Sequence, residues 1–579
     1  MKLNDMNAPA SAGRAALLQP AGQAQRDGTE FNMLDLQWQS GIAKLTGGVS
    51  PIALSLAFQD WFMHLASSPG KRIELMTGLH RPFEVAGDAR FAASGWSQWP
   101  FNVLAKSFVG TEQFWQRATT GVRGVAPHHA KVVNFMAGQV LDGFSPSNFS
   151  WSNPEVLGAT LDSKGRNCTS GWANCREDMN RLQAKPPGGQ RTAHAVGVDV
   201  AQTPGKVVYR NELVELIQYT PQSATVYREP ILIVPSWILK YYILDLSAHN
   251  SMVRYLVQQG HTVFMISWRN PDAHDRNLGM DNYLSLGLMD ILDEVARIGG
   301  TEQVHAVGYC LGGTLLALAA AALGSGRQAS VAKLKSVTLL AAQTDFSEPG
   351  ELGLFIDDSE LALLDAMMWK KGYLDGDQMG GSFQLLNARD LIWSRMLHEY
   401  MLGIRPDAND LAAWNADTTR MPYRMHSEYL KHLFLDNDLA AGRYCVNGKP
   451  LALRDIQAPL FVLGTERDHV APWRSVYKIN LLSNAQIDFV LASGGHNAGI
   501  VSEPGHARRS YQFQPPRPAG SPYVGPDEWL QTAVQADGSW WPHWQQWLAA
   551  HSAAEQTAPP VMGAGVTLTD APGQYVLES

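Results

Sequence analysis

The pattern of apolar and polar positions changes once along the chain, near Thr203. Between residues 31 and 200 most apolar residues recur at helical spacing. The stretch SPIALSLAFQDWFMHLASSPGKR (50–72) predicts one amphipathic helix that its Pro-Gly pair ends. Residues 1–30 lack this spacing and are rich in Ala, Gly, Gln and Pro, which predicts a disordered arm. We therefore expect a helical N-terminal domain over residues 31–200, without a catalytic set of side chains.

Beyond Thr203, short β-rich runs alternate with helical ones. The run KVVYRNELVELIQY (206–219) alternates like an edge hairpin, and YLSLGLMDILDEVARIG (283–299) is spaced like a helix. Six further runs resemble buried strands: PILIVPSW (230–237), HTVFMISW (261–268), VHAVGY (304–309), LKSVTLLAAQ (334–343), PLFVLGTERD (459–468) and IDFVLASGGH (487–496). Strands that alternate with helices are typical of a parallel sheet covered by helices, so the fold class is α/β.

The alternation stops between about residues 346 and 445, a stretch rich in Met, Trp, Tyr and Leu. It separates two expected strands and is too long for a plain crossover, so we interpret it as an inserted cap. The catalytic domain then extends over residues 201–553 and closes with a helix at WWPHWQQWLAAH (540–551). Residues 554–579 predict a loose C-terminal tail.

The sequence HAVGYCLGGT (305–314) places Cys310 between an expected strand and the helix-like LGGTLLALAAAALG. Gly-x-Ser-x-Gly in this position is the nucleophile elbow of α/β-hydrolases, and here cysteine replaces the serine. Gly308 and Gly312 leave room for the tight turn, and the N-terminus of the following helix favours a thiolate. The alternative is a buried structural cysteine, because free cysteine packs well in protein cores.

In this fold the nucleophile is followed by an acid after a late strand and then by a histidine. Asp468 and His496 occupy these places, in FVLGTERDHVAPW and FVLASGGHNAGI. His469 and His506 are competing candidates. However, His469 adjoins the acid that would have to orient it, and His506 lies further from a strand end. The order Cys310, Asp468, His496 predicts an α/β-hydrolase fold with an inserted cap, preceded by an α-helical domain.

The formal net charge of −8 makes nucleic acid an unsuitable partner. The longest apolar run, Leu315–Leu323, is shorter than the roughly 20 residues that span a bilayer, so no transmembrane segment is expected. The N-terminus has no apolar signal region, which predicts a cytoplasmic protein. Cys168 and Cys175 lack the partners that a zinc site needs, so no metal is expected.

Several motifs together resemble the polyhydroxyalkanoate synthases over about residues 30 to 550. They are DWFMHLASSPGK, SPSNF…NPEVL, TPGKVVYRNELVELIQYTP, VPSWILKYYILDL, SWRNP, GYCLGGT, WNADTTRMP and GTERDHVAPW. The complete elbow and the length resemble the single-subunit synthases of class I or II. Two stretches depart from the family pattern: VPSWILK replaces the usual VPPxINK, and SGGHNAGIVSEPGHARRSYQ replaces the commoner SGHIAGVVNPP.

The resemblance implies that Cys310, His496 and Asp468 form a catalytic set that polymerises (R)-3-hydroxyacyl-CoA, with 3-hydroxybutyryl-CoA as the expected substrate. It also implies release of CoA, storage polyester on cytoplasmic granules and activity as a homodimer. The CoA thioester is itself the substrate, and no cofactor is expected. The alternatives are an α/β-hydrolase that cleaves polyester or acyl-CoA, and a weakly active granule-associated protein.

An oxyanion formed on the substrate carbonyl needs backbone N–H donors. The first candidate is Leu311, directly after the nucleophile, and the second is Ile238 or its neighbour Trp237, after an early strand. Arg269 and Lys240 are candidate contacts for the CoA phosphates, with structural or solvated roles as the alternative. A cap rich in Met and aromatic residues would exclude water, or would form a second small core.

Overall fold

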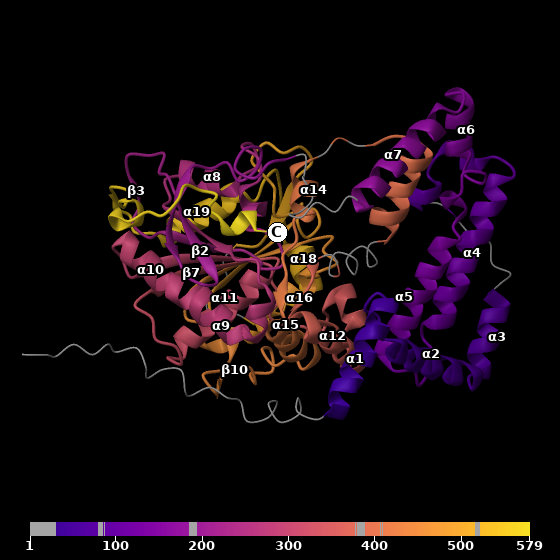
Figure 1. Cartoon of the computed structure of the whole chain (residues 1–579), viewed down its shortest axis with the longest axis horizontal. Helices are drawn as coiled ribbons and strands as arrows, with labels where there is room; N and C mark the ends of the chain where they lie inside the picture. The colour runs from indigo at the N-terminus through magenta and orange to yellow at the C-terminus, as the bar shows by residue number, and fades with distance from the viewer. Residues whose placement is uncertain are drawn as a thin grey trace, which may run out of the picture.

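The computed structural model describes residues 30–78, 85, 87–183, 194–376, 378, 388–405, 407, 409–515 and 522–578. Apart from Glu30, the predicted disordered arm lies outside the described residues. A group of helices near the N-terminus stands beside a larger α/β unit (Figure 1). In the described part of the chain, no helix is long and apolar enough to cross a membrane.

Helices build the N-terminal region, as the spacing predicts. They are α1 (Glu30–Leu45), α2 (Pro51–Ala66), α3 (Pro69–Gly78), α4 (Phe101–Thr119), α5 (Pro127–Gly143), α6 (Pro154–Asp162) and α7 (Arg166–Gln183). The expected single helix over residues 50–72 is wrong, because α2 ends at Ala66 and Pro69 begins α3. Proline suits a first helical turn, where its missing N–H has no partner to lose. Ser50 begins α2 by accepting the N–H of Ala53 at 3.3 Å.

Ten of the described strands form a mixed sheet in the order β1-β2-β5-β4-β6-β7-β12-β13-β14-β15. The strands from β5 to β13 in this order run parallel, and antiparallel strands flank them on both sides. Their bounds are β1 (Gly205–Arg210), β2 (Val214–Tyr219), β4 (Ile231–Val234), β5 (Val263–Trp268), β6 (Gln303–Tyr309), β7 (Lys333–Leu340), β12 (Leu460–Thr465), β13 (Ile487–Ala492), β14 (Ser510–Phe513) and β15 (Val534–Asp537). The central strands are buried on both faces, which explains their continuous apolar runs.

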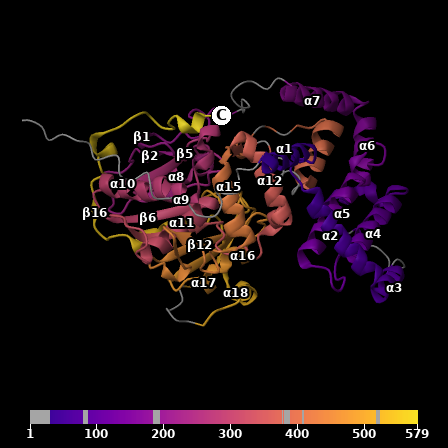
Figure 2. The same cartoon turned by 60° about the horizontal axis from the view of Figure 1, so that its bottom comes forward.

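Helices pack on the sheet and complete the core (Figure 2). They are α8 (Met252–Gln258), α9 (Met280–Leu284), α10 (Asp290–Gly299), α11 (Leu311–Gly324), α16 (Trp473–Tyr477), α17 (Ile479–Leu482), α18 (Pro526–Thr532) and α19 (Trp541–His551). The indole of Trp544 in α19 donates to Thr338 at 3.0 Å, and that of Trp547 donates to Asp488 at 2.7 Å. The tryptophans of the predicted closing helix therefore fix it to two sheet strands.

The stretch between β7 and β12 is largely helical. It contains α12 (Asp358–Lys371), α14 (Asp410–Asn415), α15 (Tyr423–Tyr429) and π-helical turns at Arg389–Trp393, Met396–Met401 and Leu430–Leu435. Short strand pairs lie within it or next to it: β8 (Tyr373–Leu374) with β9 (Met421–Pro422), and β10 (Cys445–Val446) with β11 (Lys449–Pro450). The turn at Met396–Met401 lies against α7, where Asn174 donates to the carbonyl of Glu399 at 2.9 Å. The insertion thus joins the N-terminal helices to the sheet.

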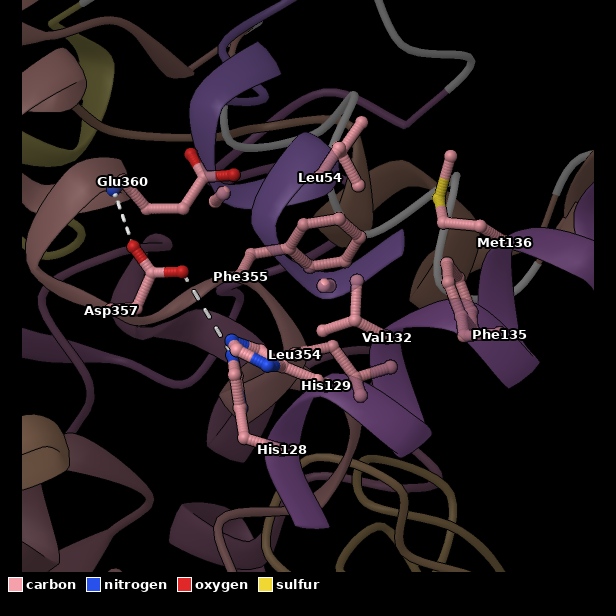
Figure 3. A pocket seen from close by; sticks show the side chains of 12 residues that line it. Leu54, His128, His129, Val132, Phe135, Met136, Leu354, Phe355, Asp357 and Glu360 are labelled. Carbon is pink, nitrogen blue, oxygen red and sulfur yellow. Dashed lines mark hydrogen bonds and ion pairs between the residues drawn. The ribbon is translucent and has the colours of Figure 1, made fainter. Parts of the chain in front are cut away.

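A second contact between the two parts lies around Glu360 of α12 (Figure 3). Glu360 is buried and accepts the N–H of Ser50 at 2.8 Å. Burial raises the pKa of Glu360 to about 7, against a weaker opposing effect of the Ser50 hydrogen bond. Nearby, His128 of α5 lies 3.9 Å from Asp357. A titratable carboxyl group is therefore enclosed where the helical region meets the catalytic domain.

The expectation of a loose tail over residues 554–579 is wrong for the described residues. Strand β16 (Gln556–Thr557) pairs with β3 (Val226–Tyr227), and the N–H of Val207 donates to the carbonyl of Thr569 at 2.8 Å. Val576 is buried in the main core. Scattered contacts to the sheet hold this stretch in place. Such contacts leave no helical or strand periodicity in the sequence, so the pattern of residues does not reveal them.

Candidate active site

Cys310 lies in a strained turn between β6 and α11, with φ 52° and ψ −123°. This conformation is costly for a residue with a side chain and is typical of nucleophile elbows. The flanking glycines explain how the turn fits. A Cβ on Gly308 would stand 2.4 Å from the Cα of Gly313, and one on Gly312 would stand 2.2 Å from the carbonyl oxygen of Val234. The Gly-x-Cys-x-Gly pattern is therefore required by backbone packing.

The same close approach brings the loop after β4 to the start of α11. Leu311 is the first residue of α11, so its N–H has no acceptor within the helix. In the neighbouring loop, the N–H of Ile238 has only a long contact of 3.4 Å to the hydroxyl of Ser236. Both predicted oxyanion donors thus belong to segments that meet at the elbow, and their role stays a prediction.

The carboxylate of Asp468 is buried just beyond β12 and is saturated with hydrogen bonds. Its Oδ1 accepts the N–H groups of Val470 at 2.9 Å and Ala471 at 2.7 Å. Its Oδ2 accepts the hydroxyl of Thr465 at 3.0 Å and lies 2.7 Å from Nδ1 of His496. Because a carboxylate only accepts, Nδ1 carries the proton, and Nε2 is left to accept one.

His496 interacts with both other members of the predicted set, Asp468 and Cys310. Burial by itself would lower the pKa of His496. The charges of Asp468 and Cys310, and hydrogen bonds to both, raise that pKa well above the ordinary histidine value. His496 thus interacts with both Asp468 and Cys310, and its protonated form is stabilised when Cys310 is a thiolate.

The two competing histidines lie elsewhere. His506 is half-buried, and its Nδ1 lies 2.8 Å from the carbonyl of Ala507. His469 contributes its backbone carbonyl to the N–H of Glu351 at 3.4 Å. It is the ring of His496 that reaches Asp468.

Three residues near the predicted set were not identified from the sequence: Tyr309, Asn497 and Asn415. Tyr309, the residue before Cys310, is buried with its ring 5.6 Å from that of His496. Its hydroxyl donates to Oδ1 of Asn497 at 2.7 Å, and the Asn497 amide donates in turn to Asn415 of α14 at 3.2 Å. The available signal was position alone, since Tyr309 and Asn497 adjoin the two candidate catalytic residues. They link the elbow, the histidine loop and the cap.

The inserted stretch comes close to Cys310. Tyr429 of α15 is buried, and its pKa is raised well above the ordinary tyrosine value by burial and by the nearby charge of Cys310. Leu430, Leu433 and Phe434 belong to the main apolar core, which also contains Cys310, itself only 9% exposed. The insertion thus forms part of the core with the sheet, and its role in keeping water from the thiol stays a prediction.

The structure gives both predicted CoA contacts structural partners. Arg269 forms an ion pair with Asp275 at 2.5 Å and donates to the carbonyl of Glu212. Lys240 is 3% exposed and donates to the carbonyls of Tyr575 and Glu578. Lys240 is not presented to solvent in the way that a phosphate contact requires, so this prediction is wrong for Lys240, because the distant residues Tyr575 and Glu578 occupy its ammonium group. The side chain of Arg269 stays 21% exposed beside Asp275, and its contact with CoA stays a prediction.

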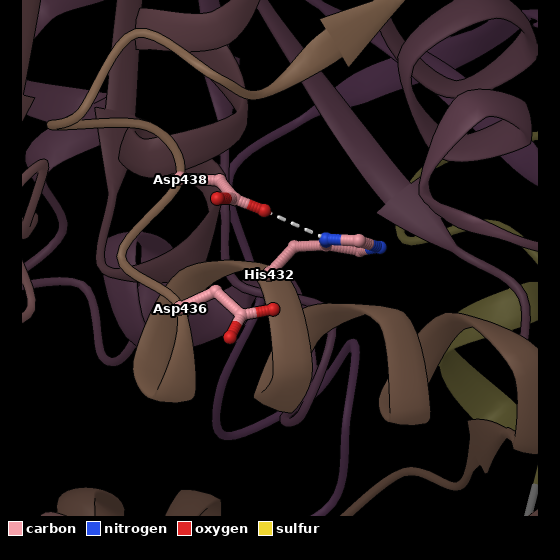
Figure 4. Close-up of side chains that lie close together, drawn as sticks. All are labelled: His432, Asp436 and Asp438. Carbon is pink, nitrogen blue, oxygen red and sulfur yellow. Dashed lines mark hydrogen bonds and ion pairs between the residues drawn. The ribbon is translucent and has the colours of Figure 1, made fainter.

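Among the described residues, His432, Asp436 and Asp438 place their ligand atoms within 4.8 Å of one another (Figure 4). His432 Nδ1 lies 2.9 Å from one oxygen of Asp438, and Arg443 donates to the other at 2.8 Å. The Asp438 carboxylate is thus already paired with the guanidinium of Arg443 and in contact with the ring of His432. This arrangement is an ordinary ion-pair cluster.

Comparison with known sequences matches three family models to the chain. "Poly-beta-hydroxybutyrate polymerase N terminal" matches residues 29–71, and "Poly-beta-hydroxybutyrate polymerase (PhaC) N-terminus" matches residues 87–256. The model of the α/β hydrolase fold matches residues 229–503. The predicted fold class is confirmed, because the sheet, its helices and the helical N-terminal region agree with this match.

Several curated proteins are similar over most of the chain. The poly(3-hydroxyalkanoate) polymerase of Methylorubrum extorquens is 38% identical over 502 residues, covering 84% of this chain and 80% of the relative. The poly(3-hydroxyalkanoate) polymerase subunit PhaC of Rhizobium etli is 36% identical, covering 91% and 82%. The corresponding subunit of Cupriavidus necator is 34% identical, covering 84% and 83%.

Proposed function

Because the chain belongs to the poly(3-hydroxyalkanoate) polymerases, we propose that it builds polyester from (R)-3-hydroxyacyl-CoA through an acyl thioester on Cys310. We propose (R)-3-hydroxybutyryl-CoA as its principal substrate. One observation carries the mechanism: a cysteine occupies the strained elbow position, beside the His496–Asp468 pair.

In the first step, Nε2 of His496 takes the proton of the Cys310 thiol, and the thiolate attacks the thioester carbonyl of the substrate. The N–H of Leu311, and one from the loop that holds Ile238, would stabilise the oxyanion. The intermediate expels CoA, which leaves with the proton from His496. One thioester replaces another, so the acyl group stays activated for the next transfer.

In the second step, the 3-hydroxyl of an incoming acyl-CoA attacks the acyl-Cys310 carbonyl, and His496 takes the hydroxyl proton. As the new ester bond forms, the thioester bond to Cys310 breaks and the thiolate of Cys310 leaves. The lengthened chain is still a CoA thioester and can return to Cys310 by a second exchange that releases CoA. Water competes with the hydroxyl for acyl-Cys310. The closed apolar cap, which leaves Cys310 9% exposed, supports polymerisation over hydrolysis.

We further propose that the protein works as a homodimer in the cytoplasm at the surface of the polyester granule. Large apolar side chains stand exposed in the N-terminal helical region, including Trp38 at 73%, Met63 at 66% and, in the turn before α4, Trp99 at 81%. Exposed apolar surface of this kind favours association with an apolar partner. Binding of the purified protein to polyester particles, with and without these side chains changed to serine, would test the granule proposal.

The central test is acyl labelling of the purified protein with (R)-3-hydroxybutyryl-CoA that carries an isotope in the acyl group. We expect wild type and a control Cys445→Ala, which changes an exposed cysteine, to bind label, release CoA and form polymer. Cys310→Ala should do none of these while remaining folded. Cys310→Ser should be severely impaired, because an alcohol ionises far less readily. Normal activity of Cys310→Ala would reject the nucleophile, and free hydroxy acid as the main wild-type product would identify a hydrolase.

A further inference from the structure

Lys240 is a buried cation without a catalytic assignment. It is 3% exposed, and its ammonium group donates to the carbonyls of Tyr575 at 3.1 Å and Glu578 at 2.7 Å. Burial lowers the pKa of Lys240, and the charges of Asp417 and Glu578 oppose this effect. A buried ammonium group persists only where acceptors and counter-charges surround it. Specific contacts therefore hold this one lysine, which ends the loop after β4.

The acceptors of Lys240 belong to a stretch that is itself firmly attached, which we call the 570–578 segment. Glu215 of β2 is fully buried and accepts the N–H groups of Gln574 at 2.9 Å and Tyr575 at 3.0 Å. The side chain of Glu578 accepts the N–H of Asn270 at 3.0 Å, just beyond β5. The 570–578 segment is thus fixed to the ends of two sheet strands and supplies a rigid anchor for Lys240.

The loop that Lys240 ends is the one that approaches the elbow. The cap holds its backbone, because Thr419 donates to the carbonyls of Trp237 at 2.5 Å and Ile238 at 3.2 Å. The indole of Trp414 donates to the carbonyl of Lys240 itself at 2.7 Å. At its other end, the loop touches Gly312, where no side chain would fit. Contacts on several sides therefore fix the path of this loop beside Cys310.

We propose that Lys240 is a positioning residue for acylation. Clamped by the 570–578 segment, Lys240 keeps the loop of residues 235–240 in the position where its backbone N–H groups stabilise the oxyanion on the substrate of Cys310. The inference rests on the proposed function, because it assigns the loop to a step of that reaction. It also explains why the 570–578 segment is ordered, and why Lys240 faces the protein interior rather than a phosphate.

The test compares single-turnover acylation, kcat, KM and melting temperature in full-length variants. Lys240→Met keeps most of the side-chain length and loses the ammonium group. We expect its acylation rate to fall by about 10- to 100-fold with KM changed less than about threefold, since losing one oxyanion donor costs about 10² to 10³ in kcat. Lys240→Arg, which keeps a cation, should recover part of the rate.

Two further variants separate positioning from folding. Glu578→Ala releases the 570–578 segment from Asn270 and leaves Lys240 intact, and should lower acylation by about tenfold at unchanged KM. Lys206→Ala breaks the exposed ion pair with Asp570 on the same segment, and should acylate normally.

The other outcomes overturn the inference. Normal acylation in both Lys240→Met and Glu578→Ala would exclude a positioning role. A raised KM at unchanged kcat in Lys240→Met would make Lys240 a CoA contact. If wild type itself forms no acyl-Cys310, the proposed function fails and the inference fails with it, whereas a labelled wild type with unaffected variants rejects the inference alone.

Discussion

Asp468→Asn should separate the two proton transfers of polymer synthesis. In the structure, the N–H groups of Val470 and Ala471 point at one carboxylate oxygen, so the amide oxygen of asparagine will take that place. The amide nitrogen then stands 2.7 Å from Nδ1 of His496, where the carboxylate oxygen is now. Because an amide nitrogen donates, Nδ1 must accept, and the imidazole proton moves to Nε2. In this tautomer His496 cannot take a proton from Cys310 or from a hydroxyl.

The size of the effect follows from the geometry. Unit charges 2.7 Å apart attract by about 6 kcal/mol at an effective dielectric constant of about 20, so the imidazolium loses most of its stabilisation. A base held in the wrong tautomer loses about 10⁴ in rate, or about 5.4 kcal/mol of transition-state stabilisation. Elongation should fall by about this factor, because a hydroxyl about as weakly acidic as water cannot ionise unaided.

Acylation has a second route. An unassisted thiol with the ordinary cysteine pKa of about 8.5 is about 3% thiolate at pH 7 and about 75% at pH 9. We therefore expect Asp468→Asn to acylate about 30-fold more slowly than wild type at pH 7 and to recover by about 25-fold at pH 9. Elongation should recover little, so acyl-enzyme accumulates.

Rapid-quench labelling with acyl-labelled (R)-3-hydroxybutyryl-CoA, beside steady-state polymer formation, measures both steps across pH 7 to 9. Thr465→Val is the matched control, because it removes one hydrogen bond to Asp468 and leaves the charge. The control should slow both steps to the same modest degree. Equal loss of acylation and elongation in Asp468→Asn at every pH, without recovery at pH 9, would refute the reasoning.

Three further predictions concern stability. Gly312→Ala should destabilise the fold by about 3 kcal/mol and abolish acylation, because its Cβ would overlap backbone, while Gly138→Ala, in open space, should do neither. Burial raises the pKa of Glu360 from 4.5 to about 7, so its protonated form favours the fold and this contribution is lost as pH rises from about 4.5 to about 7. In urea unfolding, the free energy of unfolding of Glu360→Gln should thus be about 3 kcal/mol above that of wild type at pH 8 and equal to it near pH 4.5. Equal free energies of unfolding at both pH values would contradict this. Asn497→Leu should lower the free energy of unfolding by about 1–3 kcal/mol, because it leaves the buried hydroxyl of Tyr309 without its acceptor. Adding Tyr309→Phe should restore most of this loss. No recovery in the double variant would show that the loss has another cause.

Features that depend on local pattern can be predicted from the order of the residues alone. Runs such as ILIV of β4 are buried on both faces, so they read as central strands of a parallel sheet. The glycines around Cys310 mark the elbow because any side chain there would strike backbone. Asp468 and His496 could be chosen because both follow strands whose ends meet at one edge of the sheet. These inferences need only periodicity, chain order and one tight turn.

Features that depend on partners far apart in the chain can be seen only in the folded protein. For Lys240 and Arg269 the sequence left a phosphate contact and a structural role open. In the fold, the carbonyls of Tyr575 and Glu578 accept from Lys240, and Asp275 pairs with Arg269. The stretch that ends in these carbonyls looked loose because scattered hydrogen bonds, without periodicity, attach it to the sheet. The link from Tyr309 through Asn497 to the cap was invisible for the same reason. A hydrogen bond between distant residues leaves no spacing in the sequence, so only the folded chain reveals it.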